Sequence, residues 1–552
     1  MPVRCTAPRQ LTALRQLTAP RQLTAPRQLT APRRLTAPRR SPALLFTALA
    51  TLMASATPAG AIEKILLRLP VLQTSFSINV AELGDPQRLL SGNSDLAQLD
   101  QASDGAIGRQ MLQVFRQPLP IQAPAVANNL AGTPMLNQVL LMLSTLGKVD
   151  GLPKKLESQL IEQALRTAAA SPKGLTLVEV LKALPGETVS VNMQQFINAL
   201  TRLMLQQTNG VTLVRQLPTA SVGPLANPGS RTVQRTEQTL SVRHRPEPLP
   251  VVVIAPVSKG NGRLVTISHG LWDAPASFEG WARHLASHGY TVALPRHIDS
   301  DSYQQREMLA GEAPPPTPEQ LRLRPLDVSS VIDAAGDGRL KLPAPVRTDA
   351  VAAMGQSWGA TTVLQLAGIR PSAARLKRHC ENPVDPGRNI SWVLQCSFVQ
   401  SADKASAPDP RVTSVAAVSP MLSLLFDHGA GRGLSAQALV VSGSRDWVVP
   451  SGPEALSPVQ DALSLGLQGS RLVLANGGDH FNLGARYDDG GGPLGALLLD
   501  WVRTTLGTDG SKPPGASAAL QATGWGNGTI PLVDATPALP GLRLAFKTPG
   551  RP

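Results

Sequence analysis

The chain is poor in aromatic residues, although it is not poor in apolar ones. Phe, Trp and Tyr make up 3% of its 552 residues, so the cores must be built mainly from aliphatic side chains. The hydrophobic fraction of 42% is sufficient for at least one sizeable core. A chain of this length is expected to form roughly two to four domains. The 50 prolines and 47 glycines predict long irregular stretches as well.

Acidic residues are absent before Glu63, and this absence accounts for most of the net charge of +14. Residues 1–40 contain nine arginines, and subtracting nine from +14 leaves +5 for the rest of the chain. No basic stripe interleaved with aromatic residues remains, so nucleic-acid binding is not expected. The hexapeptide Pro-Arg-Gln-Leu-Thr-Ala recurs through residues 8–40, and its prolines exclude a continuous helix. We interpret it as a disordered basic extension.

The apolar run Ala43–Ala56 is shorter than the roughly 20 residues that a membrane-spanning helix needs. Arg39-Arg40 precedes it and Ala59-Gly60-Ala61 follows it, which are the flanks of a secretory signal peptide. Cleavage after Ala61 would leave a chain that begins at Ile62. We therefore expect residues 1–61 to direct export to the periplasm or the exterior. The alternatives left open are an uncleaved membrane anchor and a twin-arginine route.

Cysteine is scarce, with Cys5 in the expected leader and only Cys380 and Cys396 beyond it. An oxidising compartment would allow this pair to form a disulfide, which stabilises a loop of this length by about 3 kcal/mol. Two buried free thiols are the alternative.

Residues 62–206 mostly lack strand-like alternation and predict a small all-α domain without the spacing of a metal or catalytic site. Residues 207–249 are rich in Pro, Gly, Ser and Thr and are expected to form a linker, with a candidate strand in Thr232–Arg243. Residues 507–552 are expected to be a disordered or loosely attached tail. The helices expected in the front domain are Met135–Leu143, Leu156–Ala170, Leu175–Leu184 and Met193–Leu205.

Residues 250–506 alternate short apolar runs with amphipathic segments such as Ser277–Ser287. This pattern predicts an α/β domain with a mostly parallel sheet and helices on both faces. The expected buried strands are Pro250–Ala255, Leu264–Ile267, Tyr290–Leu294, Ala350–Met354, Ser414–Val418, Ala438–Val441 and Arg471–Leu474.

The pattern Gly355-Gln356-Ser357-Trp358-Gly359 lies between an apolar strand and the apolar helical segment Ala360–Ala367. This context is typical of a nucleophile elbow, in which a sharp strand-to-helix turn exposes the serine hydroxyl. We therefore predict that Ser357 is a catalytic nucleophile.

A nucleophilic serine needs a histidine base, which in turn needs an orienting carboxylate. The histidines after Ser357 are His379, His428 and His480, and His480 follows a predicted strand through a glycine-bearing loop. We predict His480 as the base and Asp446 as the acid. Asp427 is the alternative acid, and Asp479 is too close in sequence to turn back onto its neighbour.

Two backbone amides should stabilise the oxyanion. The amide of Trp358 follows the nucleophile directly, and the loop after Leu264–Ile267 supplies the second. We predict the Leu271 amide for this role, with Trp272 as the next choice. His269 is expected to shape this loop, not to transfer protons.

These segments resemble the platelet-activating-factor acetylhydrolase and dienelactone-hydrolase-like branch of the α/β-hydrolases. The resemblance rests on Ile267–Leu271, Leu285–Ala293, Gly355–Gly359 and Gly478–Phe481. It implies an α/β-hydrolase fold and a carboxylic ester hydrolase that acts on a small acyl group, including those of phospholipids.

Two departures from this branch limit the analogy. Dienelactone hydrolases use a cysteine nucleophile, whereas this chain has Ser357. The acetylhydrolases place their acid after an earlier strand, where this chain has Ser419-Pro420, and Asp446 matches the position in cutinase-like esterases. The front segment is similar to an uncharacterised helical domain that precedes such hydrolases in exported bacterial proteins. Arg324 and Asp327 lie in a stretch found in that group and are expected to pair at a helix start.

The sequence thus predicts a serine esterase for a small-molecule or lipid ester, with no cofactor, no metal and no nucleic-acid partner. The same triad would serve a lipase or cutinase-like esterase of longer acyl chains, a serine peptidase or an acyltransferase. A non-catalytic exported binding protein is the alternative from a different class. For the front domain, the roles of lid, partner-recruiting module and membrane contact stay open, as do acyl chain length and oligomeric state.

Overall fold

The computed structural model describes residues 61–69, 74–106, 112, 116, 129, 132–150, 158–173, 175–258, 260–467, 469–507, 520 and 523–546. The basic repeat and almost all of the predicted signal peptide lie outside the described residues.

The front segment contains a four-stranded sheet, so the prediction of an all-α domain is wrong. The sheet has the order β2-β1-β4-β3, with β1 and β4 parallel and the other two pairs antiparallel. Its strands are β1 Lys64–Leu69, β2 Thr74–Asn79, β3 Gly147–Val149 and β4 Thr188–Asn192. The period-two signal was present: β2 alternates polar residues with Phe76 and Ile78, and β4 alternates them with Val189 and Val191. The strands are short, and the helical pattern around them dominated the prediction.

Helices pack around this small sheet and include three of the four predicted ones. They are the 3-10 turn η2 Glu82–Gly84, α1 Pro86–Leu90, α2 Asp95–Ala102, α5 Pro134–Leu146, α6 Ser158–Ala169 and α7 Leu177–Ala183. Ile65, Ile78, Leu83 and Leu89 are buried together and join the sheet to η2 and α1. The front segment is therefore an α+β module with its own aliphatic core.

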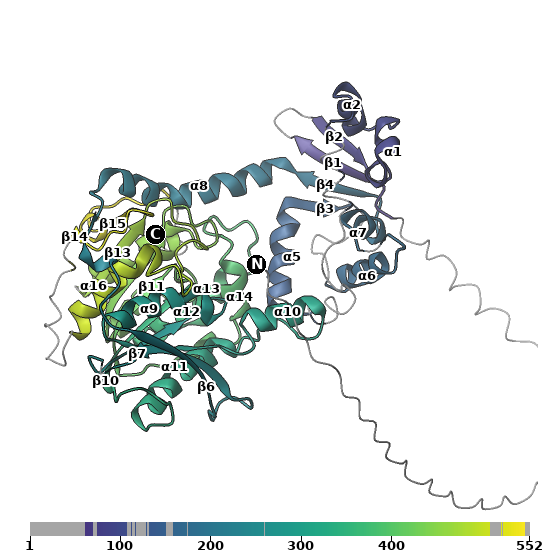
Figure 1. The fold of residues 1–552 in the computed structure, drawn as a ribbon. Coiled ribbons are helices and arrows are strands. Elements are labelled where there is room, and N and C mark those ends of the chain that lie inside the picture. Colours follow the sequence, from purple (N-terminus) through teal and green to yellow (C-terminus); the bar gives the residue numbers. More distant parts are fainter. Residues whose placement is uncertain are drawn as a thin grey trace, which may run out of the picture. The chain divides into compact units, whose positions relative to one another are not determined.

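The prediction of a linker at 207–249 is also wrong, because most of this segment belongs to helices and strands. The helix α8, Met193–Gln216, runs past the predicted end at Leu205 and is one long helix in Figure 1. Its last turns bury Leu213 and Val214 against Leu456 and Leu472 of the larger domain. After β5 Ser221–Val222 and the 3-10 turn η3 Pro224–Ala226, β6 Val233–Leu240 forms the edge of the large sheet, as the candidate strand there suggested.

The larger domain is built on a nine-stranded sheet of order β15-β13-β12-β11-β10-β8-β9-β7-β6. The neighbours from β9 to β13 pair in parallel, whereas β6, β7 and β15 pair antiparallel. All seven strands predicted for this domain are confirmed. They are β7 Leu249–Pro256, β8 Arg263–Ser268, β9 Thr291–Pro295, β10 Arg347–Gln356, β11 Val412–Val418, β12 Gln437–Gly443 and β13 Ser470–Ala475.

Helices cover both faces of this sheet, as expected for a mainly parallel sheet (Figure 1). Successive strand residues point to opposite faces, so that Ala353 packs with α11 and α12 while Ala352 and Met354 pack with α9 and α16. The helices are α9 Glu279–Ser287, α10 Ser302–Ala310, α11 Gln320–Gly336, α12 Trp358–Leu366, α13 Ala373–His379, α14 Trp392–Ser397, α15 Ser457–Ser464 and α16 Gly495–Leu506. Short turns η4 Pro275–Phe278, η5 Ala402–Lys404, η6 Ala430–Gly433, η7 Gly452–Leu456 and η8 Gly492–Leu494 connect them.

The tail at 507–552 was expected to be disordered or loosely attached, but its described part is packed on the larger domain. Residues 532–534 form β15, which pairs with β13, and Trp525, Leu532 and Val533 are buried. β14 Thr523–Gly524 pairs with β5, and the 3-10 turn η9 spans Thr536–Ala538. The Gly, Pro and Ala content of the segment hid a three-residue strand that only the edge of the sheet stabilises.

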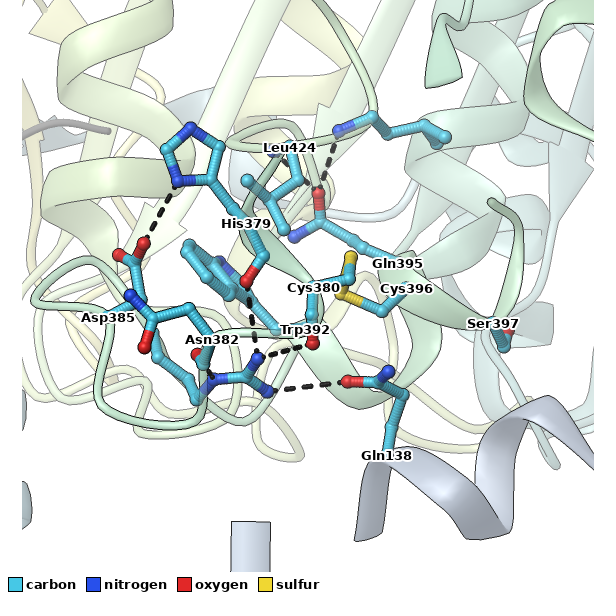
Figure 2. Close-up of a disulfide and its surroundings, with 12 residues drawn as sticks. Gln138, His379, Cys380, Asn382, Asp385, Trp392, Gln395, Cys396, Ser397 and Leu424 are labelled. Atoms are coloured by element: carbon cyan, nitrogen blue, oxygen red, sulfur yellow. Dashed lines mark hydrogen bonds and ion pairs between the residues drawn. A yellow bond between two sulfur atoms is a disulfide. The ribbon is translucent and has the colours of Figure 1, made fainter. Parts of the chain in front are cut away.

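A disulfide joins Cys380 to Cys396 across a separation of 16 residues (Figure 2). Both cysteines are buried. The enclosed loop is held by Arg388, which lies over the Trp392 ring and donates to the carbonyl of Cys380 at 2.8 Å. Arg388 also donates at 3.4 Å to Gln138 of α5, so the loop contacts the front module.

Removing this disulfide by changing both cysteines to alanine should lower the free energy of unfolding by about 3 kcal/mol, because the unfolded chain gains loop entropy. Denaturant titrations with and without reductant would measure the loss. The double variant serves as the control, since reductant should not weaken it further. Equal stability of oxidised and reduced wild-type protein would contradict the prediction.

Candidate functional site

Ser357 lies in the turn between β10 and α12 and has a strained backbone. Its φ of 55° and ψ of −121° fall where a residue with a side chain is rarely found. The surrounding packing imposes this turn: a Cβ at Gly355 would clash with the carbonyl of Gly359, and one at Gly359 would clash with that of Ser268. The two glycines of the motif therefore permit the close approach of strand and helix that holds Ser357 in place.

The structure brings Ser357, His480 and Asp446 together. The Nε2 atom of His480 lies 3.1 Å from Ser357 Oγ, and its Nδ1 lies 2.9 Å from Asp446 Oδ2. Asp446 is fully buried, and its other oxygen accepts hydrogen bonds from the amides of Val448 and Val449 at 3.0 and 2.7 Å. These bonds fix the carboxylate toward the imidazole. Since each residue follows the carboxyl end of a different parallel strand, the three meet at one edge of the sheet.

The alternative residues lie elsewhere. Asp427 and His428 line a separate, mainly apolar cavity of about 80 Å³ that does not include Ser357. His379 bonds to Asp385 inside the disulfide loop at 2.9 Å (Figure 2). Asp479 accepts hydrogen bonds from the amides of Phe481 and Asn482 and so caps its own turn.

Two glutamines support the triad, and the sequence analysis did not identify them. Gln356, the residue before Ser357, donates to the carbonyl of His480 at 2.9 Å. Gln207 of α8 donates to the carbonyl of Asp446 at 2.9 Å. Gln356 could have been found from the sequence, because it lies within the Gly355–Gly359 motif. Gln207 could not, because it lies in the stretch that was assigned to the linker.

The predicted oxyanion donors lie in the two segments that flank the serine. Trp358 is the first residue of α12, where amides lack partners within the helix. Leu271 lies in the loop after β8, and its amide has no hydrogen bond to another described residue. The amide of Trp272, the second choice of oxyanion donor, already donates to the carbonyl of Ser300 at 2.8 Å. Gly270 allows the loop to approach the serine, since a Cβ there would lie 3.2 Å from that of Ser357.

A cavity of about 630 Å³ opens onto Ser357 and His480. Its lining mixes apolar and polar side chains and includes Leu271, Trp272, Phe278, Gln305, Phe481 and Arg486. Phe481 is 73% exposed and packs edge-on to the His480 ring at 5.3 Å. Trp447, the residue after Asp446, is 46% exposed and lies 6.3 Å from Phe481. An exposed aromatic residue thus directly follows both Asp446 and His480 in the chain.

Arg324 and Asp327 do not form the expected pair at a helix start. Both lie within α11, fully buried, and contact different groups. Arg324 donates to the carbonyl of His269 and lies over the Trp358 ring at 4.7 Å. Asp327 accepts hydrogen bonds from His244, Arg245 and His297. This convergence has no local sequence signal, because the partners of Asp327 come from two other segments of the chain.

Burial disfavours the charged forms of His269 and His297. Burial is the largest cause that lowers the pKa of His297 to about 3, with the charge of Arg324 acting in the same direction. Burial likewise holds the pKa of His269 well below its usual value. Burial alone would raise the pKa of Asp327, but the hydrogen bonds from His244, His297 and Arg245 outweigh it and keep the pKa well below its usual range.

Within the described ranges, no three His, Cys, Asp or Glu side chains are grouped to hold a metal ion. None of the helices in that part of the chain has both the length and the apolar character needed to cross a bilayer.

A family model matches the front part of the chain. Residues 61–192 match the model of a family described as an alpha/beta hydrolase of unknown function. The matched segment is the front module, and it ends before Ser357. No curated protein matches the chain. The match supports an α/β-hydrolase, in agreement with the parallel sheet and its flanking helices, and leaves the reaction and the substrate undefined.

Proposed function

We propose that this protein is a serine hydrolase that cleaves carboxylic esters, with Ser357 as nucleophile, His480 as general base and Asp446 as the orienting acid. The observation that carries the proposal is the hydrogen-bonded line from Ser357 Oγ through His480 to Asp446, which faces a cavity of about 630 Å³. A strained serine at a glycine-flanked turn supports it, because such strain is kept where function requires it.

The reaction proceeds in two acyl-transfer steps. His480 Nε2 accepts the Ser357 proton while Oγ attacks the ester carbonyl, and the bond to the alcohol breaks as His480 returns the proton to the departing oxygen. Water then attacks the acyl-enzyme by the same route and releases the acid. Asp446 holds the tautomer in which Nδ1 carries hydrogen, and it stabilises the imidazolium formed in each step. The Leu271 and Trp358 amides donate to the oxyanion.

Short acyl esters are the first substrate class, in keeping with the acetylhydrolase-like segments. Longer acyl chains are the second candidate. The exposed ring of Phe481, which lines the cavity, and the exposed ring of Trp447 beside it favour them because they offer apolar surface. Export is proposed as well. The buried disulfide between Cys380 and Cys396 supports it, since such bonds persist in oxidising compartments.

A p-nitrophenyl ester series from acetate to palmitate tests this function on a chain that begins at Ile62, together with labelling by a fluorophosphonate. We expect serine-dependent turnover with a maximum at short chains. A maximum at long chains would instead favour the lipase or cutinase-like alternative. The absence of both turnover and labelling would remove the proposal and favour the non-catalytic binding protein.

A further inference from the structure

A line of buried hydrogen bonds lies behind the loop that carries the Leu271 amide. Ser268 ends β8, His297 follows β9, and Asp327 lies within α11. The Ser268 hydroxyl is 2.8 Å from His297 Nε2, and His297 Nδ1 is 2.8 Å from Asp327 Oδ2. Each of the three is at most 1% exposed, and none of them lines the cavity. They therefore do not contact substrate, and any effect on the reaction must pass through the loop.

His297 also holds His269, the first residue of this loop after the strand. The backbone amide of His297 donates to His269 Nε2 at 3.0 Å, so that nitrogen is an acceptor. In a neutral ring the hydrogen then lies on Nδ1. Nδ1 is 2.8 Å from the carbonyl oxygen of Gly270, to which it donates. The contact of His297 thus decides the tautomer of His269.

The Gly270 carbonyl belongs to the same peptide unit as the Leu271 amide. A peptide unit is planar and trans, so fixing its oxygen also fixes the direction of its N–H. The hydrogen bond from His269 therefore aims the amide that is proposed to bind the oxyanion. Gly270 lies close to the serine, where a Cβ would be 2.7 Å from Gln356 Oε1, so the loop has little room to shift.

The charged groups of this network argue against a purely structural role. Asp327 accepts two hydrogen bonds from the Arg245 guanidinium, at 2.6 and 2.7 Å, and its Oδ1 lies 2.7 Å from His244 Nε2. Arg245 is itself buried, with 7% of its surface exposed. Burying such ions is costly, and apolar residues of similar volume often give equal or greater stability. A role in fixing the orientation of one peptide unit explains why these buried charged groups are retained despite their cost.

We propose that His269 and His297 are positioning residues of the oxyanion hole, with Asp327 as their buried anchor. His269 sets the plane of the Gly270–Leu271 peptide, and His297 sets the tautomer and position of His269. This role rests on the proposed function.

The decisive variants are His269→Ala and His269→Asn. Alanine removes the donor to Gly270, whereas the asparagine amide occupies the place of Nδ1–H and restores a donor. Loss of one aligned oxyanion donor costs about 10²-fold in turnover. For His269→Ala we expect kcat for p-nitrophenyl acetate to fall by about 10²-fold with KM changed less than about threefold, and for His269→Asn we expect recovery to within about tenfold of wild type.

Inhibition by a boronic acid, which forms a tetrahedral adduct with the serine, gives a second readout. Its Ki should rise in His269→Ala by the factor by which kcat/KM falls, because both depend on oxyanion binding. His284→Ala is the matched control: this buried histidine of α9 bonds to the Leu225 carbonyl at 2.9 Å, away from the loop. The control should lower thermal stability while leaving kcat and Ki within about threefold of wild type.

Equal kcat and Ki in His269→Ala and His284→Ala would overturn the positioning role, as would a lower kcat with an unchanged Ki. If His269→Ala does not fold, His297→Gln tests the same role. It removes the side-chain bond to Asp327 that holds the His297 backbone amide against His269 Nε2, and it should raise Ki and lower kcat in parallel. Wild-type protein without turnover and without fluorophosphonate labelling would remove the proposed function and this role together. If the wild type hydrolyses the ester and the histidine variants keep its kcat and Ki, the positioning role alone is refuted.

Discussion

Ser357→Ala should reduce ester turnover by about 10⁴-fold or more, because the acyl-enzyme can no longer form and only binding and oxyanion stabilisation remain. The substitution removes a single oxygen, which lies within hydrogen-bond distance of His480 Nε2 at 3.1 Å. Initial rates on p-nitrophenyl acetate would measure the loss, and fluorophosphonate labelling should disappear in parallel. Thermal melting should stay close to that of the wild type, since alanine occupies the same strained turn.

Ser419→Ala is the control for this experiment. Ser419 also follows a strand of the sheet, is 1% exposed and has a positive φ of 49°. Its hydroxyl has no hydrogen-bond partner among the described residues. Removing it should leave turnover within about threefold of wild type. Activity of Ser357→Ala within about tenfold of wild type would refute Ser357 as the nucleophile.

Asp446→Asn should lower kcat by about 10⁴-fold while leaving the fold intact. The asparagine oxygen can still accept from the amides of Val448 and Val449. Its amide group would then face His480 Nδ1 as a donor, so the imidazole would carry its hydrogen on Nε2 and point it at Ser357. In this tautomer His480 cannot accept the serine proton. The measurement is kcat at a pH where the wild type is fully active.

Asp427→Asn is the matched control, since Asp427 was the alternative acid in the sequence and lines a cavity that excludes the serine. It should retain turnover within about threefold of the wild type. A large loss in Asp427→Asn together with retained activity in Asp446→Asn would reverse the assignment of the acid.

Much of the larger domain could be predicted because its signals are local. The central strands of the sheet are buried on both faces along most of their length, so each is a continuous apolar run such as Ala350–Met354 and is visible in a short window. The elbow was visible for the same reason, since Gly355, Ser357 and Gly359 lie within five residues. The order of Ser357, Asp446 and His480 along the chain then restricted the choice of partners.

The errors fell on segments whose structure depends on distant partners. The front sheet joins β1 to β4 across more than a hundred residues, and its strands are short. The last turns of α8 are helical beside Leu456 and Leu472, and β15 pairs with the edge of a sheet formed earlier in the chain. Composition misled in all three places, because tertiary packing overrides weak local propensity.

The sequence by itself determined the parallel α/β architecture of the larger domain, the serine turn and the candidate identities of base and acid. These follow from periodicity and from steric requirements within a few residues. Only the tertiary structure decided that Asp446, not Asp427, meets His480, and that Ser268, His269, His297 and Asp327 converge behind the Leu271 amide. A hydrogen bond between residues distant in sequence leaves no periodic trace, because it depends on where the sheet places the ends of its strands.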